Sequence, residues 1–566
     1  MHSRRTVAAS LLLAALPFAA PAHEADLTTV LQDPKPAVAA QEPKELGPGP
    51  RWRGPVRPEA ANEVFATGDG CAMCHSSSPG SNAMRNGLGD DVSPHELWQG
   101  TLMANAFKDP YFHAQLQKES EAAGDLAQPT QSLCLRCHAP MAHHSARIAG
   151  NPGPHLAQVA DDPLAEDGVS CTMCHQIKPD GLGTEKTFGG RPVIGRDREI
   201  FGPYADPAPG PMRMHSGYTP VHGPHMKTSA HCATCHTLTT HHAGKAFPEQ
   251  TPYFEWRNSV YSDEQGATAE SKTCQQCHMA RTGATRIARN PMGRDFLIPV
   301  RDDYAAHAFV GGNAFILDML RVNREELGVK APAAALARMA AATRRQLGES
   351  TATIEIGALQ AGPETLDFEV NVYNHTGHKF PTGYPARRAW LQVQVRTGDG
   401  VVFETGAYDK DGRLTGVENE LGLPHVDVVT KSSDVVVYEL LGHDEAGAPT
   451  TFLTRMATRG KDNRLLPRGW RADGPHAAET MPVGTESDPN FWAGSDTVTF
   501  RVPLPAEKAQ GAQVVAWLHY QPIPPAWVES LRTVAAEEAK RFVRMYDAAD
   551  KAPETVAVAT RRLTAQ

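Results

Sequence analysis

The sequence predicts a multidomain protein in which a part built from loops and short helices is followed by an antiparallel β-sandwich and a C-terminal helix. Three observations support this prediction. The 566 residues include 48 glycines and 45 prolines, more than average usage, which indicates many turns and loops. All ten cysteines lie between residues 71 and 277. The alternation of apolar and polar residues that is typical of half-buried strands begins only after residue 350.

The first 22 residues have the pattern of a cleaved export signal. Arg4 and Arg5 precede a short apolar stretch at 11–20, and Ala-Pro-Ala at 20–22 is typical of a cleavage site. The apolar stretch is shorter than the ~20 residues of a membrane-spanning helix. We therefore expect removal of residues 1–22, a Pro-rich extended arm over 23–60, and a periplasmic or extracytoplasmic location. We expect no transmembrane segment in the mature chain.

The ten cysteines form five C-x-x-C pairs, and a histidine follows every pair. This is the attachment motif of c-type haem, in which two thiols bind the porphyrin and the imidazole binds its iron. We therefore expect five covalently bound c-type haems in a pentahaem cytochrome c domain over residues 61–325. The motif residues are Cys71, Cys74 and His75; Cys134, Cys137 and His138; Cys171, Cys174 and His175; Cys232, Cys235 and His236; and Cys274, Cys277 and His278.

Three other uses of paired cysteines fit this pattern less well. Zinc ribbons place two C-x-x-C pairs on one metal and do not require a histidine after each pair. A thioredoxin-like centre has one such pair in a βαβ unit. Structural disulfides are common in exported proteins, but cysteines only three positions apart connect no distant segments.

A second histidine on an iron would commit that haem to electron transfer, so the other histidines decide the function. Four of them crowd the loop before motif four, and we expect His215 and His222 to be distal ligands. His307 begins an apolar stretch well beyond motif five and is a third candidate. The pairs His143/His144 and His241/His242 follow motifs closely and could each reach a neighbouring haem. We expect His95, His113 and His155 at the surface.

The second half of the chain has no cysteine. Its alanine-rich start predicts a connector helix over 326–350, and eight alternating segments predict a β-sandwich over 351–523. A C-terminal helix and tail are expected over 524–566. Within the sandwich, the stretch NHTGHKFPTGYPARRAWL reads either as an ordinary turn or as a loop that carries a ligand. We expect His378 of this loop to reach a haem of the first domain.

Several phrases around the motifs resemble an exported multihaem cytochrome c family. They are HELWQGTLMANAFKDPYFHAQL, DGVSCTMCH, EQTPYFEWRNSVYS, HAFVGGNAF and GHKFPTGYPARRAWL. The family is related to hydroxylamine-oxidoreductase-like cytochromes and their tetrahaem electron carrier. The resemblance implies closely packed, mostly bis-histidine haems, electron transfer, and distal roles for His307 and His378. No motif here has the C-x-x-C-K of pentahaem nitrite reductases, and five motifs are fewer than the eight of hydroxylamine oxidoreductases.

The formal net charge of −9 argues against a nucleic-acid partner. The sequence favours an electron-transfer protein that works between redox partner proteins, and it assigns no catalytic residue. The alternative is a multihaem oxidoreductase in which one five-coordinate haem acts on a small nitrogen or sulfur compound.

Overall fold

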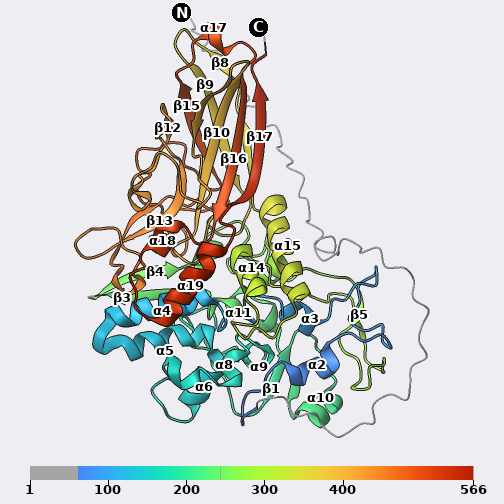
Figure 1. Ribbon diagram of the computed structural model, residues 1–566. Coiled ribbons are helices and arrows are strands. Elements are labelled where there is room, and N and C mark those ends of the chain that lie inside the picture. The colour runs from blue at the N-terminus through green and yellow to red at the C-terminus, as the bar shows by residue number, and fades with distance from the viewer. Residues whose placement is uncertain (1–60, 243, 565–566) are drawn as a thin grey trace, which may run out of the picture.

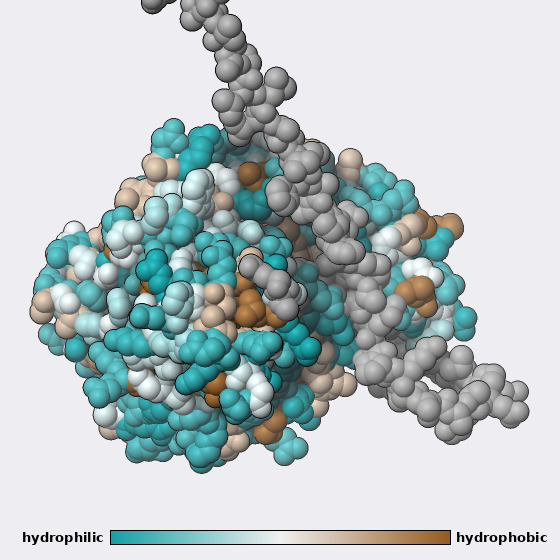
Figure 2. Space-filling view, turned by 90° about the horizontal axis from the view of Figure 1, so that it is seen from above, coloured by the Kyte–Doolittle hydropathy of each residue, from teal (hydrophilic) through white to brown (hydrophobic). Residues whose placement is uncertain are grey.

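The computed structural model describes residues 61–242 and 244–564, so the expected signal and the Pro-rich arm lie outside it. Two regions differ visibly (Figure 1): long strands stand at one end, and short helices joined by loops form the other. Seen along the strands, the surface is mainly hydrophilic with small separate hydrophobic patches (Figure 2). No helix in the described ranges is both long and apolar enough to cross a membrane.

The first region consists of short elements separated by loops. Its helices are α2 Asp69–His75, α3 Pro94–Trp98, α4 Pro110–Ala123, η1 Gly124–Leu126, α5 Ala127–His138, α6 Pro140–Ile148, α7 Leu156–Val159, α8 Pro163–Glu166, α9 Cys171–Cys174, α10 Pro209–Ser216, η2 Pro224–Lys227, α11 Ser229–Ala233, α12 Pro252–Arg257 and α13 Cys274–His278. Three two-stranded ladders accompany them: β1 Glu199–Gly202 with β2 Thr219–His222, β3 Leu238–His242 with β4 Lys245–Gln250, and β5 Thr285–Arg286 with β6 Val300–Arg301.

Two helices lead from the first region to the second, α14 Ala314–Val322 and α15 Ala333–Ser350. The alanine-rich composition of α15 suits a helix, since alanine has the highest helix propensity. These helices share one apolar core with α4 and with α19 Glu537–Ala548 near the C-terminus. In that core the rings of Tyr111 and Phe542 lie 5.2 Å apart. The end of the chain therefore completes the packing of its first region.

The second region is a β-sandwich of two sheets. One has the order β14-β13-β10-β16-β17 with β11 beside β10, and the other has the order β12-β15-β9-β7 with β8 beside β9. Their bounds are β7 Ala352–Ile356, β8 Gln360–Ala361, β9 Leu366–Asn374, β10 Arg388–Thr397, β11 Gly400–Thr405, β12 Val428–Val429, β13 Val437–His443, β14 Thr458–Asp462, β15 Ser495–Val502, β16 Gln513–Gln521 and β17 Glu554–Arg562. Within the described strands of the sandwich, only β12 and β15 pair in parallel. Phe368, Val498, Leu391 and Leu518 lie in one buried core between the sheets.

Seven of the eight alternating segments form strands. The eighth, TTFLTRMA at 450–457, does not, so the prediction of a strand there is wrong. That segment contains the short helix η4 Leu453–Arg455. The Glu119 carboxylate of α4 accepts hydrogen bonds from the amides of Leu453 (2.8 Å) and Thr454 (3.1 Å). A buried carboxylate from the first region thus satisfies backbone groups that a sheet would otherwise have paired.

The C-terminal segment also differs from expectation. The expected single helix is interrupted, with α18 Pro525–Glu529 before the gap and α19 after it. Leu531 and Val534, in the gap, turn into the helical core instead. The expected tail is the edge strand β17, which pairs with β16. Val556 is its one buried residue, so the sequence carries almost no apolar alternation there. The remaining short helices are η3 Glu420–Gly422, α16 Ala477–Thr480 and α17 Ala506–Ala509.

Candidate haem-binding sites

Four of the C-x-x-C-H motifs have both cysteines on one helix, which places their thiols on one side. Motif four begins at the end of α11 and continues into the turn that follows it. No disulfide joins any two of the ten cysteines. Among the described residues, no three or more His, Cys, Asp or Glu side chains gather in an arrangement that could hold a metal ion.

Four motif histidines are oriented by backbone carbonyls. The Nδ1–H of His75 donates to the Ile287 carbonyl (2.9 Å), and that of His138 donates to the Ala106 carbonyl (3.1 Å). In the same way His175 donates to the Phe201 carbonyl (2.7 Å) and His278 to the Val310 carbonyl (2.6 Å). A carbonyl oxygen only accepts, so Nδ1 must carry the proton and the Nε2 lone pair is free. Such a bond to the outer nitrogen is the usual support of a metal-bound histidine.

The protonation state of the buried histidines also suits iron ligation. Burial lowers the pKa of His138 and of His236 to about 4. Burial likewise lowers the pKa of His75 and His175, against the effect of their carbonyl bonds. At neutral pH these imidazoles are therefore uncharged, which is the form that binds a metal.

Two histidines from outside the motifs face motif histidines. The ring centres of His175 and His307 lie 6.2 Å apart with 17° between the ring planes, and those of His278 and His378 lie 6.4 Å apart with 12°. Metal–imidazole bonds of about 2 Å, as for zinc, place two ring centres about 6 Å apart across one ion. The donor set and its spacing therefore fit two irons with two axial imidazoles each.

The two outer histidines are oriented like the motif histidines. Nδ1–H of His307 donates to the Ala305 carbonyl (3.2 Å), and Nδ1–H of His378 donates to the Lys379 carbonyl (2.8 Å). Burial lowers the pKa of His307 to about 3 and also lowers the pKa of His378. Both side chains therefore have a free Nε2.

Thiol contacts join the motifs to one another. Cys71 and Cys171 affect each other's ionisation, as do Cys137 and Cys235, and Cys232 and Cys274, so the thiols of each pair lie close together. The neighbouring thiol, together with burial, raises the pKa of the Cys71, Cys137 and Cys232 thiols. Cys174 also acts electrostatically on Cys232, so motif three lies beside motif four. All five motifs consequently form one continuous cluster.

The other candidate histidines have varied surroundings. Among the described residues, no ring contact joins His215 of α10 or the exposed His222 of β2 to a motif histidine, so their ligand roles stay predictions. His95 is not at the surface: its side chain is 14% exposed and packs on Trp98. His113 and His155 are also partly buried.

Two further histidines have the features of unassigned ligands. His144 has a backbone hydrogen bond to Gly190, a pKa that burial lowers to about 4, and a buried Nε2 that no described group bonds. Burial lowers the pKa of His231 to about 3, and no described group bonds its Nδ1. His143 instead bonds Ser132 through Nε2 at 3.2 Å. The adjacency of His144 to motif two and of His231 to motif four is the sequence signal for both.

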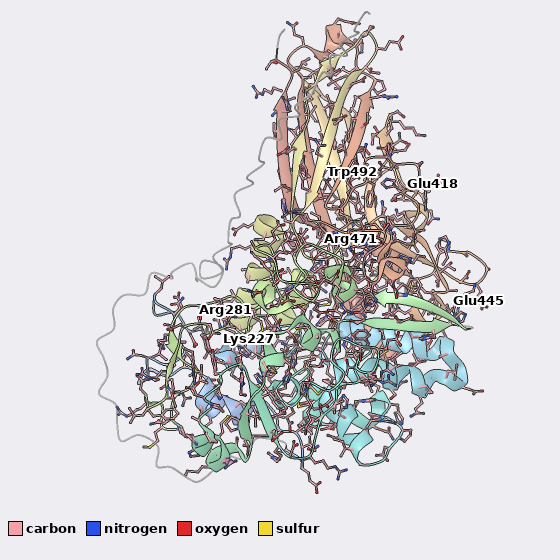
Figure 3. The ribbon with its side chains drawn as sticks, turned by 180° about the vertical axis from the view of Figure 1, so that it is seen from behind. Lys227, Arg281, Glu418, Glu445, Arg471 and Trp492 are labelled. Carbon is pink, nitrogen blue, oxygen red and sulfur yellow. The ribbon has the colours of Figure 1, made fainter. Side chains whose placement is uncertain are left out.

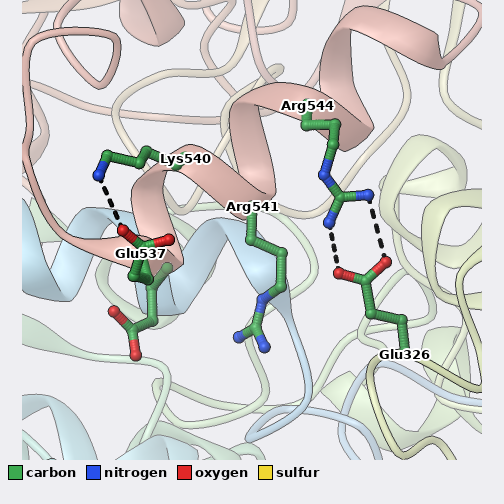
Figure 4. Close-up of a pocket in the computed structure, with 6 residues that line it drawn as sticks. Glu326, Glu537, Lys540, Arg541 and Arg544 are labelled. Atoms are coloured by element: carbon green, nitrogen blue, oxygen red, sulfur yellow. Dashed lines mark hydrogen bonds and ion pairs between the residues drawn. The ribbon is translucent and has the colours of Figure 1, made fainter.

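Charged side chains near motif five are paired. Lys227 and Arg281 lie close together in the helical region (Figure 3), and both contact Asp303, at 2.7 and 3.7 Å. A groove along α19 is lined by Glu326, Arg541 and other charged residues (Figure 4). It contains the ion pairs Arg544–Glu326 and Lys540–Glu537 and no motif residue. Neither place competes with the motif cluster as the functional site.

No family model and no curated protein matches the sequence. Among solved structures, a penta-heme cytochrome c552 from Thermochromatium tepidum is similar, with 17% sequence identity and a TM-score of 0.51. The match covers 89% of this chain and 100% of that chain. The chain therefore shares the overall fold of a solved penta-heme cytochrome.

Proposed function

We propose that this chain is an exported cytochrome that holds five c-type haems and transfers electrons between redox partner proteins. The observation that carries the proposal is the gathering of five C-x-x-C-H motifs, separated by up to 63 residues between successive starts, into one contiguous cluster. The fold shared with a penta-heme cytochrome supports it.

Haem supplies reversible one-electron chemistry at iron when it is bound. The chain would hold it through the ten cysteine thiols and the five motif histidines. We further propose His307 as second ligand opposite His175, and His378 as second ligand opposite His278. Their free Nε2 atoms and the ring spacings of 6.2 and 6.4 Å support these assignments. His215 and His222 are retained as candidates for the other irons.

The contacts between motifs suggest the order in which redox centres would follow one another. Motif one adjoins motif three, motif three adjoins motif four, and motif four adjoins motif five. Motif two adjoins motif four. The protein would therefore hold the centres of motifs one, three, four and five in a row, in that order. The centre of motif two would branch off at motif four.

One observation favours the alternative, an oxidoreductase acting on a small nitrogen or sulfur compound. Burial lowers the pKa of His236 to about 4, and the charges of His278 and then Arg387 contribute to the same shift. Arg387 is held by a hydrogen bond to the Thr382 carbonyl (2.8 Å). A fixed cation near a motif histidine could bind a small anion if the iron of motif four lacked a second histidine.

Ferric and ferrous spectra of the purified protein distinguish these functions. Electron transfer predicts five haems per chain by mass spectrometry, fully low-spin ferric iron, and no shift with carbon monoxide after reduction. A high-spin fraction of about one haem in five would favour the oxidoreductase. Anion binding to that haem that is lost in the Arg387→Ala variant would favour it further. Colourless protein would contradict both.

A further inference from the structure

We propose that Glu255 is a positioning residue that fixes His378 opposite His278 through a buried cluster of four charges. This interdomain charge cluster consists of Glu255, Lys379, Asp462 and Arg464. The inference rests on the proposed function, because it presumes that His278 and His378 bind one iron. It adds a role for residues that lie outside the motifs and come from both regions.

The loop that carries His378 joins β9 to β10 and is fixed from within by Asn374. The fully buried Asn374 amide donates to the carbonyls of His378 (2.9 Å), Leu465 (3.1 Å) and Leu466 (3.1 Å). The Thr376 hydroxyl also donates to the His378 carbonyl at 2.7 Å. These bonds set the shape of the loop within the sandwich, but they do not attach it to the first region.

Glu255 attaches the loop to the first region next to His378, and the Tyr261 hydroxyl adds a hydrogen bond to the His375 carbonyl at 3.1 Å. Glu255 is fully buried in α12, which precedes motif five, and its Oε2 accepts the backbone N–H of Lys379 at 3.0 Å. The same oxygen accepts the hydroxyl of Thr382. Its Oε1 accepts the Thr251 hydroxyl at 2.9 Å. One carboxylate of the first region therefore binds the residue next to His378 directly.

The other three members balance the charge of Glu255. The Lys379 ammonium donates to Asp462 at 2.7 Å, with both side chains fully buried. Arg464 binds Asp462 through two hydrogen bonds of 2.7 and 2.9 Å and reaches Glu255 at 3.3 Å. Burial opposes ionisation of Asp462, but Arg464 and Lys379 outweigh it and hold the pKa of its carboxyl well below the usual range.

A buried ion cluster is not in itself a source of stability, since burying charges costs about as much as their pairing returns. Its strict geometry can, however, specify one arrangement of two surfaces. Here the arrangement determines whether the His378 ring reaches 6.4 Å from the His278 ring. Removing the charge of Glu255 leaves Lys379, Arg464 and also Arg459, which lies 3.5 Å from Asp462, beside one anion, and this favours release of the loop.

The experiment compares Glu255→Gln with two other variants of the full haem-loaded protein. Glu420→Gln is the matched control, because Glu420 is also a buried carboxylate and binds Arg388 (2.9 Å) and the Leu414 amide (2.7 Å). His378→Ala reports the loss of the ligand itself. The readouts are electron paramagnetic resonance of the ferric protein, a redox titration, and the effect of added imidazole.

We expect His378→Ala to convert about one of five haems to a high-spin form that imidazole returns to low spin. Glu255→Gln should give the same species in part, with at least a tenfold higher imidazole sensitivity than Glu420→Gln. If Glu255→Gln fails to fold, Thr382→Val removes one bond to the same oxygen and should give a smaller change of the same kind.

The outcomes separate the inference from its premise. If His378→Ala leaves every haem low-spin, then His378 is not a ligand and the proposed ligand pair is wrong. If His378→Ala changes one haem while Glu255→Gln and Thr382→Val match Glu420→Gln, the ligand pair stands and the positioning role of Glu255 is wrong.

Discussion

The two regions of this chain are stabilised in different ways. The sandwich has one continuous core that runs between its sheets, whereas motifs two, three and four adjoin small separate clusters of buried apolar residues. The larger core beside motif five is shared with the C-terminal helix α19. The sandwich is built of long strands, and the motif region of short helices and two-stranded ladders. The segments that carry motifs two to four have little apolar core of their own, so we expect their packing to depend on an attached group more than that of the sandwich does.

The most decisive test of this difference in stabilisation is to prevent haem attachment. A chain produced without cytochrome c maturation should lose most amide protection in the segments that carry motifs two to four, because the apolar group that packs there is absent. The sandwich strands should keep protection within about tenfold, since their core is made of side chains. Hydrogen exchange followed by mass spectrometry measures both regions at once. Equal loss in both would mean that the sandwich has no independent stability.

Replacing His307 tests whether the motif region is organised around its irons. His307→Ala should convert about one of five haems to high spin, because the Nε2 that faces His175 is removed. His222→Ala is the comparison variant, since His222 is exposed in β2. Optical and paramagnetic resonance spectra check the result. A change with His222→Ala and none with His307→Ala would reverse our ranking of the distal ligands.

A core substitution should affect the sandwich alone. Phe500 is fully buried in β15, so Phe500→Ala should lower the free energy of unfolding of the sandwich by about 3–5 kcal/mol. The haem spectrum should not change, because Phe500 belongs to the core between the sheets. Denaturant unfolding monitored by circular dichroism and by haem absorbance gives both values. Parallel loss of the two signals would show that the regions unfold as one unit.

The sandwich should also respond to pH by itself. Burial, and secondarily the charge of Asp488, raise the pKa of Asp496 to about 7, although the Tyr438 hydroxyl donates to it at 2.7 Å. The folded state holds this proton more tightly than the unfolded state. Stability from this group is therefore present at low pH and is lost as pH rises from about 4 to 7, by ~3 kcal/mol.

Asp496→Asn should remove that pH dependence. Urea unfolding of the variant and of the unmodified protein at pH 4, 5.5 and 7 checks it. A difference between the two proteins that is constant over this range would mean that Asp496 has an ordinary pKa in the folded state.

The sequence predicts the parts of this molecule that depend on local patterns. The C-x-x-C-H motifs and most strands are of this kind, and the fold shared with a penta-heme cytochrome agrees with them. The Ile287 carbonyl that orients His75 could not be predicted from a sequence pattern, because every residue has a carbonyl. The contact between Glu119 and Leu453 joins residues more than three hundred positions apart, and it replaces an expected strand.

The interdomain charge cluster could not be predicted for a related reason. Glu255 lies in EQTPYFEWRN and Asp462 in RGKDNRL, where a charged residue reads as an ordinary surface residue. Only the fold shows that both are fully buried. His378, by contrast, was singled out because a compact glycine- and proline-rich turn on a rigid sandwich can present a ligand.

The packing of α19 against α4 has a consequence for how the protein is made. Tyr111 and Phe542 meet in one core although more than four hundred residues separate them. Contacts of such long range close late and slow folding. The early helices can therefore complete their packing only after the end of the chain has been synthesised. In the cytochrome proposed above, the motif thiols would remain accessible for haem attachment until α19 packs against α4.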